Sequence, residues 1–341
     1  MSRDLIVSLT AHFSELLATE QSADVRIALL QKYLTEFPKS RNLKDFSRVA
    51  SLFFHRQWIR ISIRGHTQSV SRAIRKLKRG DLRGAEHELE LALLWIGQAE
   101  KLYETISFFK TFALRELNHY VMSANELHTG DVVLSYKTNY YLRRSLVSLL
   151  VKFASNSSIT HAMIVSNLPH EQPELLFSGD TTHGLGTIEP TPCPGEILLV
   201  LEPRNSAIQT TLLSSVSKWR MRARARTEIK RLGAPDRYSF PELKCQVASA
   251  LGVLTVICVY IGLPLSLRNP AQAQSGVFCS ELIDDLYKES GVLLSPRSAH
   301  NATVGPVEFL YSPLLKLRGI IANKEDLAHI QTEIRNQFFT S

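Results

Sequence analysis

The stretch Gly130–Tyr136, "GDVVLSY", marks the point at which the chain changes from helical to strand-forming patterns. A Gly-Asp turn opens it, and β-branched and other apolar residues follow, which is typical of a strand that begins at a turn. Three more short runs of this kind, each bounded by Gly, Pro, Asn or Asp, are "THAMIVSN" (160–167), "ELLFSGD" (174–180) and "GEILLVLEP" (195–203). We expect these four segments to be strands of one antiparallel sheet.

Helical patterns follow the strands, at about 206–231, 242–262 and 279–290, so we predict an α+β fold for this part of the chain. The last of these helices begins in the stretch Gly276–Ile283, "GVFCSELI", where a cysteine stands between an aromatic residue and a Ser-Glu pair. A thiol at a helix N-terminus lies at the positive end of the helix dipole, which favours the thiolate. Cys279 is therefore placed where a nucleophile would be placed.

Before the first strand the apolar residues recur at three-to-four spacing, which indicates helices packed on helices. One continuous stripe runs from Leu89 to Tyr120, and the turn "KRGDLRG" (78–84) separates it from a helix expected at about Gln68–Lys78. The N-terminal stretch reads as an amphipathic helix and lacks the features of a secretory signal. We predict an N-terminal α-helical bundle at 1–125, a mixed domain at 126–320 and a helical tail at 321–341.

Composition and charge are ordinary for a globular protein of 341 residues, with 44% hydrophobic and 21% charged residues and a net charge of +8. Two basic patches, at 56–79 and 218–231, are interpreted as solvated helix faces rather than as nucleic-acid sites. The four cysteines form no CxxC pair, and no two histidines have ligand spacing on one face, so we expect a reducing, cytoplasmic location and neither metal nor cofactor.

The segment Val247–Leu267 contains no charged residue over about the length that spans a bilayer. Its Ser, Thr, Gly and Pro residues, and its position between Tyr238 and Cys279, favour a buried helix beside the site over a membrane span. If this helix lines the pocket, the substrate is lipid-like. Peripheral contact with a membrane also fits this segment.

A thiolate nucleophile needs a base, and His161 is the histidine that the pattern places best, because it stands at the start of a strand directly after polar residues. The alternative is a histidine at a strand end that bonds a backbone carbonyl, and from the pattern alone the two interpretations have equal weight.

An ordered series of segments resembles the circularly permuted NlpC/P60, papain-like cysteine hydrolases of the YiiX/YebB type. "GDVVLSY" is similar to the Gly-Asp strand of that family, "ITHAMIV" (159–165) to its histidine strand, "LGAPDRYSF" (232–240) to its Gly-x-Pro-Tyr segment and "FCSEL" (278–282) to its nucleophile motif. "LLSPRSA" and "VGPVEFLYSPLL" resemble its Pro-containing tail. The resemblance covers about residues 126–320 and none of the bundle.

The resemblance implies a papain-like α+β core in which Cys279 attacks an acyl group on nitrogen or oxygen and His161 transfers protons. It also places Tyr238 and Phe278, which lie in two of the matching segments, among the substrate-binding residues. Where the family often has a glutamate on the strand after the histidine, this chain has Ser178, with Asp180 nearby. Either residue could orient His161, or the pair could work as a dyad.

Two functions of different classes follow from these residues. One is a cysteine hydrolase, an amidase or thiol peptidase, or an acyltransferase or lipid-ester hydrolase with the same dyad, whose substrate is an amide or ester of a peptide or lipid-like molecule. The other is a binding or scaffold protein that the basic helices recruit to an anionic surface and that has lost catalysis. The presence of both Cys279 and His161 favours the enzyme.

Overall fold

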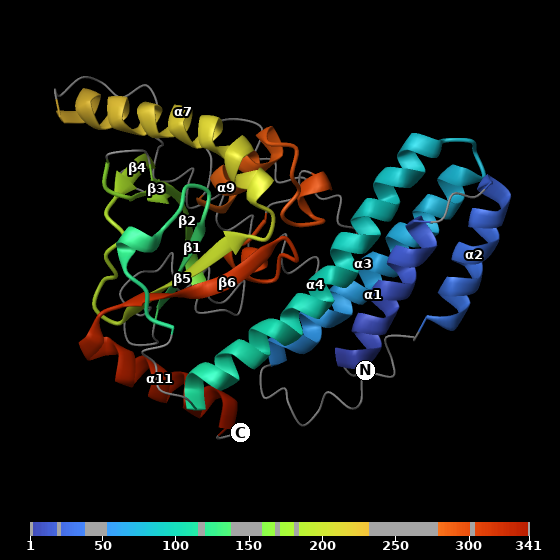
Figure 1. Ribbon diagram of the computed structural model, residues 1–341, viewed down its shortest axis with the longest axis horizontal. Coiled ribbons are helices and arrows are strands. Elements are labelled where there is room, and N and C mark those ends of the chain that lie inside the picture. The colour runs from blue at the N-terminus through green and yellow to red at the C-terminus, as the bar shows by residue number, and fades with distance from the viewer. Residues whose placement is uncertain are drawn as a thin grey trace. The chain divides into compact units, whose positions relative to one another are not determined.

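The computed structural model describes residues 3–18, 22–37, 53–114, 120–137, 159–167, 171–180, 184–231, 279–300 and 304–339. Within these residues the protein is α+β, as predicted, with eight α-helices and one six-stranded antiparallel sheet (Figure 1). The chain divides into two compact units, one formed by residues 1–109, 311–313 and 337–341 and the other by residues 110–310 and 314–336.

The first unit is helical and contains α1 (Arg3–Ala18), α2 (Ala23–Glu36), α3 (Phe53–Leu77) and most of α4 (Leu82–Leu114). The predicted amphipathic N-terminal helix is α1. The expected helix at Gln68–Lys78 is only the second half of α3, because buried Trp58, Ile59 and Ile63 extend the same apolar face toward the N-terminus.

A tight turn joins α3 to α4, and a close contact holds the two helices together. Gly80 has a φ of +76°, a left-handed conformation that suits glycine, and Asp81 caps α4 by accepting the N–H of Gly84 at 2.9 Å. Further along, Gly65 lies against the indole of Trp95 so closely that a Cβ at this position would stand 2.4 Å from the ring. A larger residue there would force the helices apart.

The sheet of the second unit has the strand order β4-β3-β2-β1-β5-β6. The four predicted strands are confirmed as β1 (Val132–Lys137), β2 (Ile159–Ser166), β3 (Glu174–Asp180) and β5 (Glu196–Pro203). Two strands were not predicted, β4 (Gly184–Ile188) and β6 (Leu315–Ala322). Glycines in β4, and Lys316 and Arg318 in β6, hide the apolar alternation that identifies a strand.

The turn before β1 depends on the Gly-Asp pair that opens the strand. Gly130 has a φ of +91° and its Cα lies close to Leu212, while Asp131 is fully buried and accepts the backbone N–H of His128 at 2.8 Å. The Asp131 carboxylate also contacts Arg318 Nη1 at 3.3 Å. Burial raises the pKa of Asp131 to about 6, although the His128 N–H and the Arg318 charge oppose this rise.

Backbone hydrogen bonds connect β6 to the segment that precedes β1. Met122 N–H donates to the carbonyl of Ile320 at 2.9 Å, and Ile320 N–H donates to the carbonyl of Tyr120 at 2.8 Å. Gly319 permits this approach, because a Cβ there would stand 2.9 Å from the Tyr120 carbonyl oxygen. The expected helical stripe to Tyr120 is therefore wrong at its end: α4 stops at Leu114, and Tyr120 bonds to the sheet instead.

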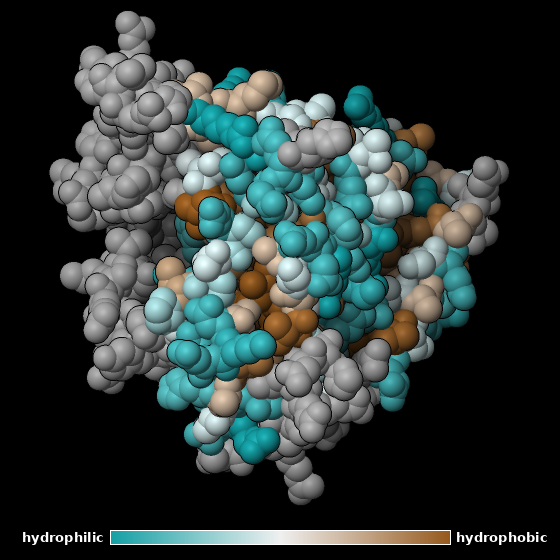
Figure 2. Space-filling view, turned by 60° about the vertical axis from the view of Figure 1, so that its left-hand side comes forward, coloured by the Kyte–Doolittle hydropathy of each residue, from teal (hydrophilic) through white to brown (hydrophobic). Residues whose placement is uncertain are grey.

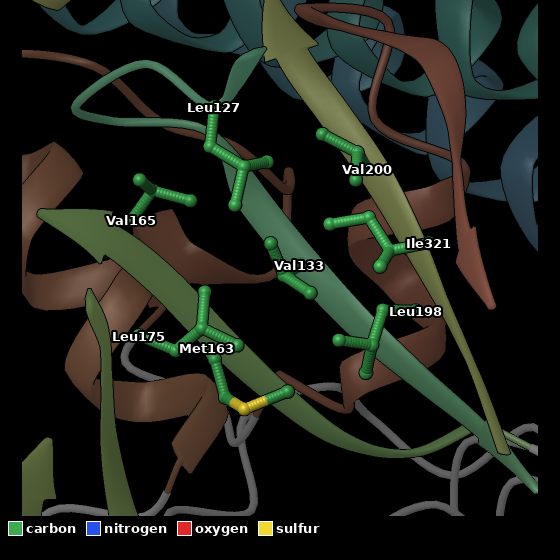
Figure 3. Close-up of a cluster of buried hydrophobic side chains, with 8 residues drawn as sticks. All are labelled: Leu127, Val133, Met163, Val165, Leu175, Leu198, Val200 and Ile321. Atoms are coloured by element: carbon green, nitrogen blue, oxygen red, sulfur yellow. The ribbon is translucent and has the colours of Figure 1, made fainter. Parts of the chain in front are cut away.

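One face of the sheet carries a cluster of apolar side chains that comes from five strands and the segment before β1 (Figure 3). Its members are Leu127, Val133, Met163, Val165, Leu175, Leu198, Val200 and Ile321. The helices of this unit are α7 (Ser206–Arg231), α9 (Cys279–Glu289), α10 (Pro306–Leu310) and α11 (Lys324–Phe339). Of these, α7 packs mainly on β4, and α9 packs on β2 and β3.

Two of the three helices predicted after the strands are confirmed as α7 and α9, whereas the third, at 242–262, lies outside the described residues together with the apolar segment 247–267. Among the residues that the structure describes, no helix combines the length and the apolar character needed to cross a membrane. On the face shown in Figure 2, hydrophilic residues cover much of the described surface and hydrophobic residues form small groups between them.

Candidate active site

Cys279 is the first residue of α9, as predicted, and the packing of this helix fixes its position. Leu282, Ile283, Leu286 and Tyr287 recur at helical spacing and are completely buried. The Tyr287 hydroxyl donates to the carbonyl of Gly130 at 2.8 Å and so connects the helix to the turn before β1. These contacts pack α9 on the sheet and fix the position of its N-terminus, which carries the Cys279 thiol.

His161 lies near the start of β2, as predicted, on the strand that α9 contacts. Its register partner on β1 is Ser135, so the two side chains project from the same face of the sheet. The side chains of His161 and Cys279 are both partly exposed.

A hydrogen bond joins Cys279 and His161, and each changes the titration of the other. Burial raises the pKa of the Cys279 thiol, but the charge and hydrogen bond of His161, with the backbone N–H groups of Ala162 and Ser280, outweigh burial and bring this pKa below its usual value. Burial and the positive charge of Lys137 lower the pKa of His161, but the Cys279 thiolate, together with the charge of Glu196, outweighs them and raises this pKa. The arrangement favours a thiolate–imidazolium pair.

A second part of the site, formed by Glu196 and Ser135 and called the Glu196–Ser135 arm below, was not predicted from the sequence. Glu196, at the start of β5, is buried and accepts hydrogen bonds from the hydroxyl of Ser135 and from the backbone N–H of Cys193, the latter at 2.9 Å. The negative charge of Glu196 contributes to raising the pKa of His161. The strand order β2-β1-β5 alone brings these residues together, so no local pattern in the sequence could have indicated the contact.

The other predicted site residues are not brought into contact with the pair by any described interaction. Ser178 and Asp180 lie on β3, and the backbone of Asp180 pairs with Gly184 of β4. The described pairing of β2 with β3 begins at Ile164 and runs away from His161. Tyr238 and Phe278 lie outside the described residues. Roles for these four residues stay predictions.

The remaining titratable groups of interest have structural surroundings. His66, on α3, is completely buried; its Nδ1 bonds the carbonyl of Ala92 at 2.8 Å and its Nε2 bonds the hydroxyl of Tyr33 at 2.9 Å. A carbonyl only accepts, so Nδ1 carries the proton and Nε2 accepts from Tyr33, which is a satisfied neutral ring. Across the described ranges, no group of three or more His, Cys, Asp or Glu residues could hold a metal ion.

No protein-family model matches the chain, and no curated protein sequence matches it.

Proposed function

We propose that the sheet-containing unit is a cysteine hydrolase of the permuted papain-like type, with Cys279 as nucleophile and His161 as general base. The observation that carries the proposal is the hydrogen bond between a partly exposed thiol at a helix N-terminus and an imidazole on the adjacent strand, which lowers the pKa of the thiol. A nucleophile within reach of its base is the minimum machinery for covalent acyl chemistry. The order of the strands and α9 along the chain is compatible with the resemblance.

In the proposed reaction the thiolate attacks the carbonyl carbon of an amide or ester, and the carbonyl electrons move to oxygen. Backbone N–H groups at the start of α9 stabilise this oxyanion, a contribution of about 3 kcal/mol per donor. When the intermediate collapses, the bond from carbon to the leaving nitrogen or oxygen breaks. The leaving atom takes the proton of the His161 imidazolium, and a thioester remains on Cys279.

Water completes the cycle by giving a proton to the neutral imidazole while its oxygen attacks the thioester. The carbon–sulfur bond breaks, the carboxylic acid departs and the thiolate–imidazolium pair forms again. An amine or alcohol in place of water gives acyl transfer, and a lipid ester enters by the same steps. The substrate class is therefore an activated or unactivated acyl group on nitrogen or oxygen.

Acylation by a chromogenic ester tests this proposal directly. With p-nitrophenyl acetate at neutral pH, we expect a burst of p-nitrophenolate and an acetyl group on Cys279, identified by peptide mass spectrometry. Cys279→Ser should remove the burst. Cys193→Ser should keep it, because partial burial of the Cys193 thiol and the charge of Glu196 raise its pKa, although the residue as a whole is exposed. Equal acetylation of Cys193 and Cys279 in the wild type would exclude a specialised nucleophile.

A second candidate function, recruitment to an anionic membrane surface, is favoured by the charge of α3. This 25-residue helix contains no Asp or Glu, and five exposed cations lie on or just after it: Arg60, Arg64, Arg75, Lys78 and Arg79. None of the five forms an ion pair within the described ranges, whereas neighbouring Arg72 and Lys76 both bind Glu88. At helical spacing, these cations cover one side of α3 over about 27 Å.

Sedimentation with phospholipid vesicles tests the recruitment. Each cation near an anionic bilayer contributes about 1 kcal/mol, so Arg60→Gln/Arg64→Gln/Arg75→Gln should weaken binding to phosphatidylserine-containing vesicles by about a hundredfold. Lys218→Gln/Arg222→Gln/Lys324→Gln, a change of equal charge at exposed positions of the other unit, is the matched control and should have little effect. Absence of wild-type binding at low salt, or equal losses in both triple variants, would exclude this role for α3.

A further inference from the structure

The polar residues around His161 form a row across three neighbouring strands. β1 lies between β2 and β5 in the sheet. Ser135 of β1 is the register partner of His161 of β2, and Lys137 of β1 is the register partner of Glu196 of β5. Residues two apart on a strand share a face, so Glu196, Ser135 and His161 all project from the same face. Their order across the sheet is carboxylate, hydroxyl, imidazole.

The hydrogen bonds in this row have a defined direction. A serine hydroxyl has one proton, and that of Ser135 is donated to Glu196 Oε1. The second carboxylate oxygen, Oε2, accepts the N–H of Cys193 at 2.9 Å, so both oxygens of Glu196 are held in place. With its proton committed, the Ser135 oxygen presents lone pairs, and the side chain directly opposite it is His161. This oxygen can therefore only accept from an imidazole N–H.

We propose that Glu196, acting through the hydroxyl of Ser135, orients the His161 ring and stabilises its protonated form during catalysis. Both are positioning residues, since they act through His161 and no interaction given for the described residues joins either of them to the Cys279 thiol. The inference rests on the proposed function and assigns to β5 and β1 the role that the resemblance gave to β3, where Ser178 and Asp180 were the candidates. Three observations support it together: the register, the direction of the hydrogen bonds, and the burial of Glu196 with its charge close enough to act on His161.

Glu196 should affect the pH range over which Cys279 and His161 form a thiolate–imidazolium pair. The buried negative charge of Glu196 favours the His161 imidazolium, whereas the positive charge of Lys137, which pairs with Glu196 in the sheet, opposes it. The imidazolium in turn favours the Cys279 thiolate. Loss of the Glu196 charge should therefore lower the upper pH limit of the ion pair, at which His161 loses its proton. The lower limit, at which Cys279 ionises beside an imidazolium that is already charged, should not rise. The pH window of the ion pair therefore narrows from its alkaline side alone, which a general loss of stability would not produce.

Alkylation of Cys279, followed by peptide mass spectrometry, measures both limits. Iodoacetamide is neutral, so its rate rises with pH as the thiolate forms. Iodoacetate is an anion that the imidazolium attracts, so its rate falls again when His161 loses its proton. For Glu196→Gln, which keeps the shape and an acceptor for Ser135, we expect the falling limb to move to lower pH while the rising limb does not move to higher pH. The iodoacetate rate at the optimum should fall by about tenfold, the size expected for a charge-assisted hydrogen bond.

Variants of Ser135 test whether the hydroxyl carries the effect. Ser135→Ala should narrow the window as Glu196→Gln does, and Ser135→Thr, which restores a hydroxyl, should recover most of it. Glu202→Gln is the matched control: it makes the same substitution on the same strand, at the end away from His161, where Glu202 contacts Lys316 and Arg318. Its pH profile should equal that of the wild type.

The outcomes separate this inference from the proposed function. If Cys279 is no more reactive than Cys193 in the wild type, the proposed function fails before the arm is tested. If Cys279 is selectively reactive but neither Glu196→Gln nor Ser135→Ala moves the falling limb, the role of Glu196 and Ser135 is overturned and the proposed function stands. A shift in Glu196→Gln with none in Ser135→Ala also overturns the role given to the hydroxyl. Should Glu196→Gln fail to fold, Ser135→Ala and Ser135→Thr still decide.

Discussion

Burial disfavours the charged form of both His66 in the helical unit and His161 in the sheet unit, yet their pKa values shift in opposite directions. Burial lowers the pKa of His66 to about 4, and its hydrogen bond to the Ala92 carbonyl opposes this only weakly. Burial acts on His161 in the same sense, but the thiolate of Cys279 and the carboxylate of Glu196 reverse it. A histidine becomes a charged partner only where the fold supplies negative charge, so its burial alone says nothing about catalysis.

The largest expected effect comes from removing the charged partner of the thiol. His161→Gln should slow the alkylation of Cys279 at pH 6 by on the order of a hundredfold, because the thiol loses the interactions that lower its pKa. His66→Gln is the matched control, and the reactivity of its Cys279 should stay within about twofold of wild type. Equal rates for wild type and His161→Gln would mean that the two histidines do not differ in function.

Acid should reveal the cost of charging His66. The pKa of His66 is lower in the folded protein than in the unfolded chain. The stabilisation that comes from keeping His66 neutral is therefore fully present above about pH 6.5 and is lost as the pH falls toward 4, by up to about 3 kcal/mol. Urea unfolding at several pH values can measure this. In a Trp219→Phe background the fluorescence comes from Trp58 and Trp95 of the helical unit. The free energy of unfolding should depend less steeply on pH between 4 and 6.5 in His66→Gln than in the wild type. An unchanged dependence would mean that other groups cause the loss of stability in acid.

A smaller effect is expected from the hydroxyl that bonds His66. Tyr33→Phe leaves the buried Nε2 without its donor, which should lower the free energy of unfolding at pH 7 by about 1–2 kcal/mol. The double variant with His66→Gln should cost less than the sum of the single changes, because the two residues share one interaction. Additive effects would show that the hydrogen bond does not account for the neutral state of His66.

The smallest effect concerns Cys193, whose backbone N–H bonds the same carboxylate that acts on His161. Burial first, and then the negative charge of Glu196, raise the pKa of the Cys193 thiol. Glu196→Gln should therefore speed the alkylation of Cys193 at pH 8 by about threefold, while it slows that of Cys279. Changes of the same sign at both cysteines would indicate altered exposure instead of an altered charge.

The sequence predicted those elements whose pattern lies within a short stretch of the chain. The turn and β-branched residues identified β1, β2, β3 and β5, and the placement of a cysteine before an amphipathic pattern identified the start of α9. It was uninformative where the contact depends on topology. Glu196 stands 35 positions after His161 and becomes its neighbour only because β1 lies between their strands. Nothing in the residues around "GEILLVLEP" distinguishes this glutamate from a solvated one at a strand start.

The segment that precedes β1 covers part of the exposed edge of the sheet at β6. An edge strand exposes backbone donors and acceptors on which another chain can add a strand, and proteins limit this hazard by covering or charging their edges. Here Val121 pairs with Ile320 in parallel orientation, and the N–H and carbonyl of Ile320 are used by the protein itself. Lys316 and Arg318 place charges along the same strand. The bridge to Val121 and these two charges therefore limit edge-to-edge aggregation at β6.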